Sequence, residues 1–343
     1  MNKLIKSKSN SFKGSEKIIC VTGGNGFIGR KLVEELATRD FRIRVLTREV
    51  GNQFPNNVKT FIGDLTDSKY CLESFLKDCD ILFHCAGETK NEAKMSLLHI
   101  VGTQKLIASV QQEISHSKKM VHWIQLSSCG AYGPPPKNDV QVFREIVETS
   151  ETAPVNEYER TKTRSDELVV AASANNFFYT ILRPSNVVGA SMKHNSFHTL
   201  IKIVNSGYFF FTGRKDAVST YVHVDDVVNA MILIAINPKS RNETFNISSD
   251  CSWVALVNKI SSTLNVKTLP FRIPYNFISA LLSLLNFFIG RFIHVPQLST
   301  FALRTTYPTR KIESYLGFEF TKRLPQSIEN LIQKKEFLRN RDA

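Results

Sequence analysis

Residues 21–30, with the sequence VTGGNGFIGR, constrain the fold of this chain more than any other stretch. They follow an apolar run at 18–21 that predicts a buried strand. They lead into a run whose apolar residues share one helical face: Ile28, Leu32, Val33 and Leu36. Three glycines are spaced three residues apart: Gly23, Gly26 and Gly29. Glycine adopts the angles of a tight strand-to-helix turn easily and lets a pyrophosphate approach the N–H groups of the helix start. The turn therefore predicts a dinucleotide site, with a tight turn that binds no ligand as the alternative.

The charge balance of the chain favours anionic partners. Its 343 residues contain 44 lysines and arginines against 31 acidic residues, which gives a formal net charge of +13. A phosphorylated cofactor, a diphosphate substrate or an acidic membrane surface would suit this balance. We find no nucleic-acid recognition motif in the sequence and expect no nucleic-acid partner. Part of the charge lies at the ends, where we predict a basic flexible tail at 1–15 and a second tail at 336–343.

The cysteines and the N-terminus predict a cytoplasmic protein. None of the six cysteines is in a CxxC pair, so we expect reduced thiols and no metal site. The first residues contain lysines without an apolar core, so we expect no signal peptide.

Strand-like and helical patterns alternate through the first half of the chain. After the first helix, strand-like runs recur at steps of about 25 residues: 42–47, 58–63, 81–87, 121–126 and 179–183. This alternation is typical of an α/β protein with a doubly wound parallel sheet. In such sheets ligands bind at the carboxyl ends of the strands.

Residues at three of these strand ends are candidates for cofactor contact. The second strand ends in Arg48, where an NAD enzyme usually has an acid; an arginine can pair with a 2′-phosphate, so NADP(H) is favoured and NAD(H) stays open. The alternative is an ordinary surface arginine. Asp64, before Leu65, is placed either to reach the adenine edge or to cap the next helix. Ala86 and Gly87 end the fourth strand and let backbone pass close to the cofactor.

A hydroxyl-rich loop and a Tyr–Lys pair supply the candidate chemistry. Ser127 and Ser128 lie just past the fifth strand, and the next helical run carries Tyr158 and Lys162. A spacing of four places the last two side chains on one helix face.

Together these motifs resemble the extended short-chain dehydrogenase/reductase superfamily, in its NAD(P)-dependent epimerase/dehydratase branch. The matching pieces run in family order: TGGNGFIG at 22–29, GDL at 63–65, HCAG at 84–87, SSCGAYG at 127–133, YERTK at 158–162, LRPSNVVG at 182–189, YVHVDDVVNA at 221–230, FNIS at 245–248 and LGF at 316–318. The resemblance implies a Rossmann domain, a doubly wound parallel sheet, at 16–183 plus about 221–249. It implies a smaller, mostly helical C-terminal substrate lobe at about 184–220 and 250–335.

The resemblance also implies roles for the candidate residues. Tyr158 is the acid/base, Lys162 its helper and a contact of the nicotinamide ribose, and Ser128 holds the substrate oxygen. The cofactor-binding set adds residues beside those named above: Phe27, Ile28 and Pro184. A free tyrosine titrates near pH 10, and a neighbouring ammonium together with a cationic nicotinamide would favour the phenolate.

Two departures from the family pattern bear on the substrate. Dehydratases have an Asp-Glu pair after the serine, whereas this chain has Cys129 and Gly130, so the groups that eliminate water are missing. Nucleotide-sugar enzymes often have an arginine where Ser219 stands, which removes one diphosphate contact. His99 replaces the usual asparagine of NVxGT and is expected to be structural.

The resemblance favours an oxidoreductase acting at C4 of an activated sugar, nucleotide-linked or polyprenyl-diphosphate-linked, in surface-glycan biosynthesis. Arg48 favours a 4-ketoreductase slightly over a 4-epimerase. The alternatives are a 3β-hydroxysteroid-dehydrogenase-like enzyme and a non-catalytic cofactor-binding scaffold. A homodimer through the Tyr158 helix is the family habit.

The apolar segment 277–289 admits two interpretations. Its thirteen residues are too few to span a bilayer, so it is either a buried or substrate-facing helix or an interfacial segment. In the second case the protein would touch the inner face of the membrane or a lipid-linked substrate.

Overall fold

A computed structural model of the chain describes residues 17–49, 54–136, 142–192, 196–269, 271–277, 280 and 300–332. Both predicted tails and most of the segment 277–289 lie outside the described residues. Within the described residues no helix is long and apolar enough to cross a membrane, no cluster of metal-ligating side chains occurs, and the six cysteines are unpaired thiols.

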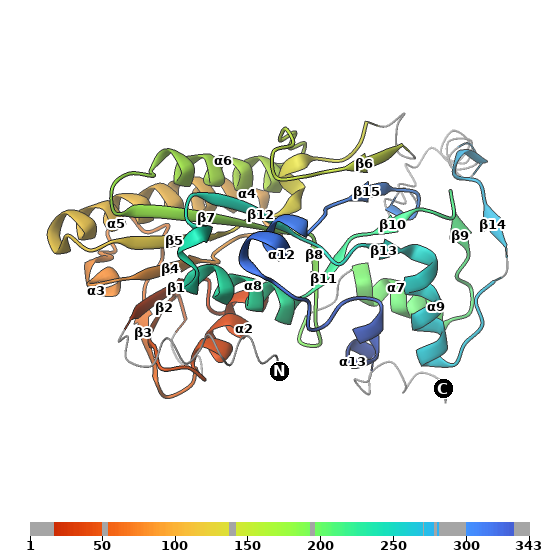
Figure 1. Ribbon diagram of the computed structural model, residues 1–343, viewed down its shortest axis with the longest axis horizontal. Helices are drawn as coiled ribbons and strands as arrows, with labels where there is room; N and C mark the ends of the chain where they lie inside the picture. Colours follow the sequence, from red (N-terminus) through yellow and green to blue (C-terminus); the bar gives the residue numbers. More distant parts are fainter. Residues whose placement is uncertain are drawn as a thin grey trace.

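Seven parallel strands form the central sheet, in the order β12-β7-β5-β4-β1-β2-β3 (Figure 1). Their bounds are β1 Ile18–Thr22, β2 Arg42–Thr47, β3 Val58–Ile62, β4 Ile81–His84, β5 Val121–Leu126, β7 Phe177–Pro184 and β12 Glu243–Ile247. Strand order reverses direction next to β1, because the chain runs from β1 outward to β3 and then returns to β4 on the other side. This confirms the doubly wound fold, and it places the glycine-rich turn at the reversal point, where such sheets bind ligands.

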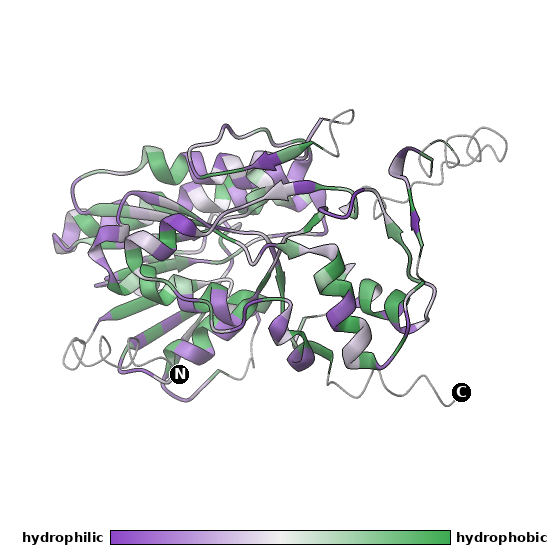
Figure 2. Ribbon diagram, turned by 45° about the vertical axis from the view of Figure 1, so that its right-hand side comes forward, coloured by the Kyte–Doolittle hydropathy of each residue, from purple (hydrophilic) through white to green (hydrophobic). Residues whose placement is uncertain are grey.

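Helices cover both faces of the sheet (Figure 1). On one face lie α2 Phe27–Leu36 and α8 Val224–Ile236, which pack together and bury an apolar cluster against the strands. On the other lie α3 Glu73–Leu76, α4 Glu92–Ser96, α5 Thr103–Ser117 and α6 Glu157–Ala171. Hydrophobic residues are concentrated in the strands between these layers, and the outer helices carry hydrophilic stretches (Figure 2). Leu32, Val33 and Leu36 of α2 are buried as predicted.

A second lobe has a hydrophobic cluster of its own. Its helices are α7 Ser196–Asn205, α9 Trp253–Leu264 and α13 Glu329–Ile332, and Trp253 and Phe197 are among its buried side chains. Four short strand pairs lie outside the central sheet: β6 Phe143–Glu145 with β15 Arg304–Thr306, β8 Asn186–Val188 with β11 Tyr221–His223, β9 Phe211–Thr212 with β14 Arg272–Ile273, and β10 Val218–Ser219 with β13 Cys251–Ser252. The chain then returns to the sheet domain, where α12 Arg310–Leu316 buries Ile312 and Leu316 in the same cluster as α2 and α8.

The apolar patterns of the sequence predict one helix through 97–110 and another at 221–237, and the structure differs from both. Tyr221–His223 form strand β11, and the helix begins only at Val224. The cause is a non-local pairing, because β11 is parallel to β8. The helix expected through 97–110 is also interrupted: a π-helical turn, Leu97–Gly102, joins α4 to α5.

Candidate active site

The glycine-rich turn is held tightly against the end of β4. Gly23 has φ +71°, and a Cβ there would lie 2.4 Å from the backbone nitrogen of Ala86. A Cβ on Gly29 would lie 2.2 Å from the carbonyl oxygen of Gly23. Gly26 donates its N–H to the same carbonyl at 3.0 Å. Gly23 and Gly29 therefore have no room for a side chain. Because the turn lies close against the end of β4, it leaves room for a ligand above it.

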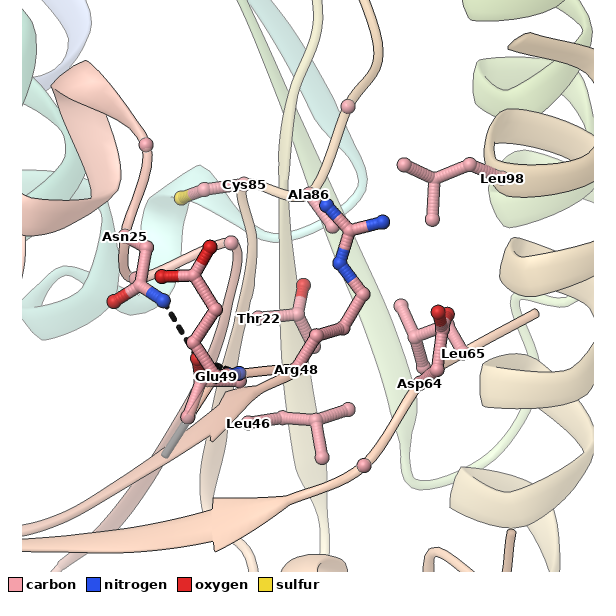
Figure 3. A pocket seen from close by; sticks show the side chains of 16 residues that line it. Thr22, Asn25, Leu46, Arg48, Glu49, Asp64, Leu65, Cys85, Ala86 and Leu98 are labelled. Atoms are coloured by element: carbon pink, nitrogen blue, oxygen red, sulfur yellow. Dashed lines mark hydrogen bonds between the residues drawn. The ribbon is translucent and has the colours of Figure 1, made fainter. Parts of the chain in front are cut away.

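A pocket of about 290 Å³ lies above this turn, at the carboxyl ends of β1, β2 and β4. Seven of the predicted cofactor residues line it: Gly23, Gly26, Arg48, Asp64, Leu65, Ala86 and Gly87. The Arg48 side chain reaches across the pocket toward Ala86 and Leu98 (Figure 3). Asn25 ties the turn to the end of β2 by donating to Thr47 Oγ1 at 2.6 Å. A glycine cradle beside this pocket, which Arg48, Glu49 and Asp64 also line, suits a dinucleotide.

Three other predicted cofactor residues, Phe27, Ile28 and Pro184, are not among the residues that line this pocket. Phe27 and Ile28 begin α2, and the Phe27 ring would contact a side chain at Gly189. Pro184 is buried at the carboxyl end of β7, beside Ile247 of β12. Asp64 lines the pocket and also caps a turn, because its Oδ1 accepts the N–H and hydroxyl of Thr66, each at 2.8 Å. The capped element is this turn, since α3 begins only at Glu73.

Ser128 and Tyr158 meet although they are thirty residues apart. Ser128 lies at the start of a 3-10 turn, Cys129–Tyr132, where its Oγ accepts the N–H of Gly130 at 3.0 Å. Tyr158 lies in the first turn of α6 and shares a hydrogen bond with Ser128. Burial raises the pKa of Tyr158 and the hydrogen bond from Ser128 lowers it by less. The protein alone therefore favours the protonated phenol at neutral pH, and the lowering expected from Lys162 together with a cationic nicotinamide stays a prediction.

Lys162 is buried below the tyrosine, one turn further along α6, with 5% of its surface exposed. Its Nζ donates to the carbonyl oxygen of Leu126, the last residue of β5, at 2.7 Å. Burial lowers the pKa of this amine, while the carboxylate of Asp166 raises it. Lys162 is thus fixed to the same strand end that leads to Ser128.

A buried ion pair that sequence reasoning missed supports these residues from behind. Asp166 Oδ2 accepts the hydroxyl of Ser127 at 2.6 Å and Nη2 of Arg183 at 3.2 Å. Burial raises the pKa of Asp166, and Arg183 opposes that shift. Removing one partner of such a pair leaves an unpaired buried charge, so the pair fixes α6 against β5 and β7. The i, i+4 spacing of Lys162 and Asp166 was the available sequence signal.

His99 connects the loop that follows β4 with helix α6, in the structural role expected for it. Its Nε2 accepts the backbone N–H of Glu88 at 2.8 Å, and its Nδ1 lies 2.8 Å from Thr161 Oγ1. The ring also meets Tyr158 edge to face, with centroids 5.8 Å apart. Burial lowers the pKa of His99 to about 4, so the ring is neutral and can accept the Glu88 N–H.

At the two departures from the family pattern, Cys129 and Ser219 are buried and Gly130 has no side chain. Cys129 is 3% exposed, its Sγ contacts the carbonyl oxygen of Arg183 at 3.1 Å, and burial raises the pKa of the thiol. It therefore cannot act as a base toward substrate. Ser219, in place of the usual arginine, is buried with its hydroxyl on Cys251.

A sequence model of the NAD dependent epimerase/dehydratase family matches residues 19–248, more than half of the chain. The chain belongs to this family. It is therefore an enzyme of an NAD-dependent family with the extended short-chain dehydrogenase fold.

Relatives in this family act on different substrates. The mouse sterol-4-alpha-carboxylate 3-dehydrogenase (decarboxylating) is 25% identical over 344 residues, which cover 93% of this chain and 91% of the relative. The Vibrio cholerae UDP-glucose 4-epimerase is 25% identical over 268 residues, covering 75% of this chain and 79% of the relative. The crystal structure of UDP-glucose 4-epimerase with UDP-glucose from Thermotoga maritima superposes with a TM-score of 0.67 at 22% identity, covering 92% of this chain and 97% of that one.

Proposed function

We propose that the protein is an NADP(H)-dependent oxidoreductase that interconverts a ring ketone and a secondary alcohol at C4 of an activated sugar. The observation that carries this proposal is the meeting of Ser128 and Tyr158 over buried Lys162, beside the glycine cradle. A bound nicotinamide cofactor would supply or accept the hydride. Tyr158 would give a proton to the substrate oxygen or take it back, and Ser128 would hold that oxygen by a hydrogen bond.

Two features support reduction with NADP(H) over redox-neutral epimerisation with NAD(H). Arg48 extends into the pocket, where it can pair with a 2′-phosphate. Burial raises the pKa of the Tyr158 phenol, which favours the protonated state that donates a proton to a ketone oxygen. The absence of an acid–base pair at Cys129 and Gly130 speaks against elimination of water.

The second candidate is a 3β-hydroxysteroid-dehydrogenase-like activity. It is favoured by the mouse sterol dehydrogenase relative, which covers nearly the whole chain, and by Ser219, which takes the place of a diphosphate-binding arginine. Both candidates use the same Ser128, Tyr158 and Lys162, so they differ in substrate and share the chemistry.

The decisive test combines a substrate panel with Tyr158→Phe. Purified protein with NADPH or NADP⁺ is offered UDP-glucose, UDP-galactose, the 4-keto derivative that these two epimers share and a 3β-hydroxysteroid, and nicotinamide absorbance is followed. The phenylalanine retains the ring but removes the proton, so turnover should fall by roughly 100- to 10,000-fold while cofactor affinity is unchanged. Full activity of Tyr158→Phe on the true substrate would refute the mechanism.

A further inference from the structure

A carboxylate from α6 occupies the space that Gly130 leaves open beside the candidate proton donor. A Cβ on Gly130 would lie 3.1 Å from Cγ of Glu159 and 3.7 Å from its Oε1. The same point is 3.3 Å from Oγ of Ser128. Glu159 directly follows Tyr158 in the chain, and its carboxylate and the Ser128 hydroxyl both lie beside Gly130. A larger residue at 130 would displace the Glu159 side chain.

One oxygen of this carboxylate has a structural partner, whereas the other does not. Oε2 accepts the N–H of Val155 at 2.9 Å, and the N–H of Glu159 is capped by Asn156 Oδ1 at 2.9 Å. This reciprocal capping holds the side chain in place at the start of α6. Among the described residues we find no hydrogen-bond donor to Oε1. Capping therefore explains where Glu159 sits and leaves one carboxylate oxygen available on the Gly130 side.

The negative charge of Glu159 is felt by the tyrosines around it. It contributes to the raised pKa of Tyr158, after burial and Asp166, and to that of Tyr307, which stacks on Tyr132. Glu148 and Asp250 raise the pKa of Cys129 on the other side of the 3-10 turn. Negative charge from Glu159, Glu148 and Asp250 thus lies around this turn, and Arg183 opposes it on the Cys129 side.

We propose that Glu159 is a specificity residue: its free Oε1 accepts a hydrogen bond from a substrate hydroxyl next to the reacting carbon and rejects a carboxylate at that place. This inference rests on the proposed function and narrows its substrate class. A hydroxyl on a carboxylate forms a charge-assisted hydrogen bond, whereas two carboxylates in contact repel strongly. The site then suits a neutral polyhydroxylated ring. It does not suit a glycuronic acid or a ring acid that carries its carboxylate beside the ketone.

The test compares two probes that differ only at the carbon next to C4: UDP-glucose, with a hydroxymethyl group at C5, and UDP-glucuronate, with a carboxylate there. We expect the wild type to prefer UDP-glucose by at least about tenfold in kcat/KM, and Glu159→Gln to reduce that preference to about threefold or less. Glutamine retains the capping box, so α6 should remain intact, which thermal unfolding and cofactor affinity would verify. Glu157→Gln is the matched control, since it removes a charge from the same helical turn; it should leave the preference unchanged.

The outcomes separate this inference from the proposed function. An unchanged preference in Glu159→Gln, or an equal loss of preference in Glu157→Gln, would refute the role of Glu159. Turnover of a 3β-hydroxysteroid and of neither nucleotide sugar, abolished by Tyr158→Phe, would also overturn it while leaving the oxidoreductase chemistry in place. Activity that survives Tyr158→Phe would instead overturn the proposed function.

Discussion

Replacing Gly23 by alanine tests whether the cofactor cradle depends on close backbone contact. Gly23 and Gly317 both have φ +71°, but only Gly23 is crowded: a Cβ there would lie 2.4–2.6 Å from backbone atoms of Cys85 and Ala86, whereas none lies within 4 Å of Gly317. Both alanine variants must adopt a positive φ, which costs about 1–2 kcal/mol. They also share the same change in unfolded-chain entropy. Gly317→Ala is therefore a control for the positive φ without the contact with β4.

The contact itself should cost Gly23→Ala about 1–3 kcal/mol more, because backbone of the turn or of β4 must move apart. We expect Gly23→Ala to lose roughly 2–5 kcal/mol of unfolding free energy in urea, and Gly317→Ala roughly 1–2 kcal/mol. Fluorescence titration with NADPH should show at least about tenfold weaker binding for Gly23→Ala and none of this loss for Gly317→Ala. Equal stability and equal affinity in the two variants would refute the steric argument.

Two further predictions follow from single side chains. Arg48→Asp should reverse a preference for NADPH over NADH, since it exchanges the phosphate partner for a ribose partner; unchanged dissociation constants for both nucleotides would make Arg48 a surface residue. Burial raises the pKa of Asp250 from its ordinary 3.8 to about 6, so the folded state holds its proton longer and stability should fall by about 3 kcal/mol as pH rises from about 4 to 6. Asp250→Asn should lack this part of the pH dependence in urea unfolding; identical profiles would contradict the shift.

The sequence predicted the parts of this protein that depend on local pattern. Glycine spacing located the cradle, and the spacing of four placed Tyr158 and Lys162 on one face of α6. The period of strands and helices gave the parallel sheet, and the family motifs covered its strand ends. These features need no knowledge of distant partners. That is why they could be read from the chain alone.

The features that were missed depend on residues that meet only in the fold. Tyr221–His223 looked helical because its apolar pattern continues into α8, but pairing with β8 makes it a strand. The position of Glu159 over Gly130 combines two motifs that have no sequence relation. Asp64 had two possible roles in the sequence, and the structure shows it capping a turn within the pocket wall.

The protonation state of Tyr158 separates reduction from epimerisation. Its ring lies against His99, and its hydroxyl shares a hydrogen bond with Ser128. Burial together with Asp166 and Glu159 raises its pKa, while Lys162 Nζ is bound to Leu126.

Reduction needs a protonated phenol, which this environment supplies at neutral pH; oxidation of an alcohol, the first half of epimerisation, needs the phenolate. We therefore expect kcat for ketone reduction to stay flat between about pH 6 and 9, and kcat for alcohol oxidation to rise through that range. Stopped-flow measurement of both directions with the same substrate pair would check this. A flat oxidation profile would mean that bound substrate and cofactor lower the pKa of the Tyr158 phenol enough to form the phenolate at neutral pH. The protonation state of Tyr158 would then no longer favour reduction over epimerisation.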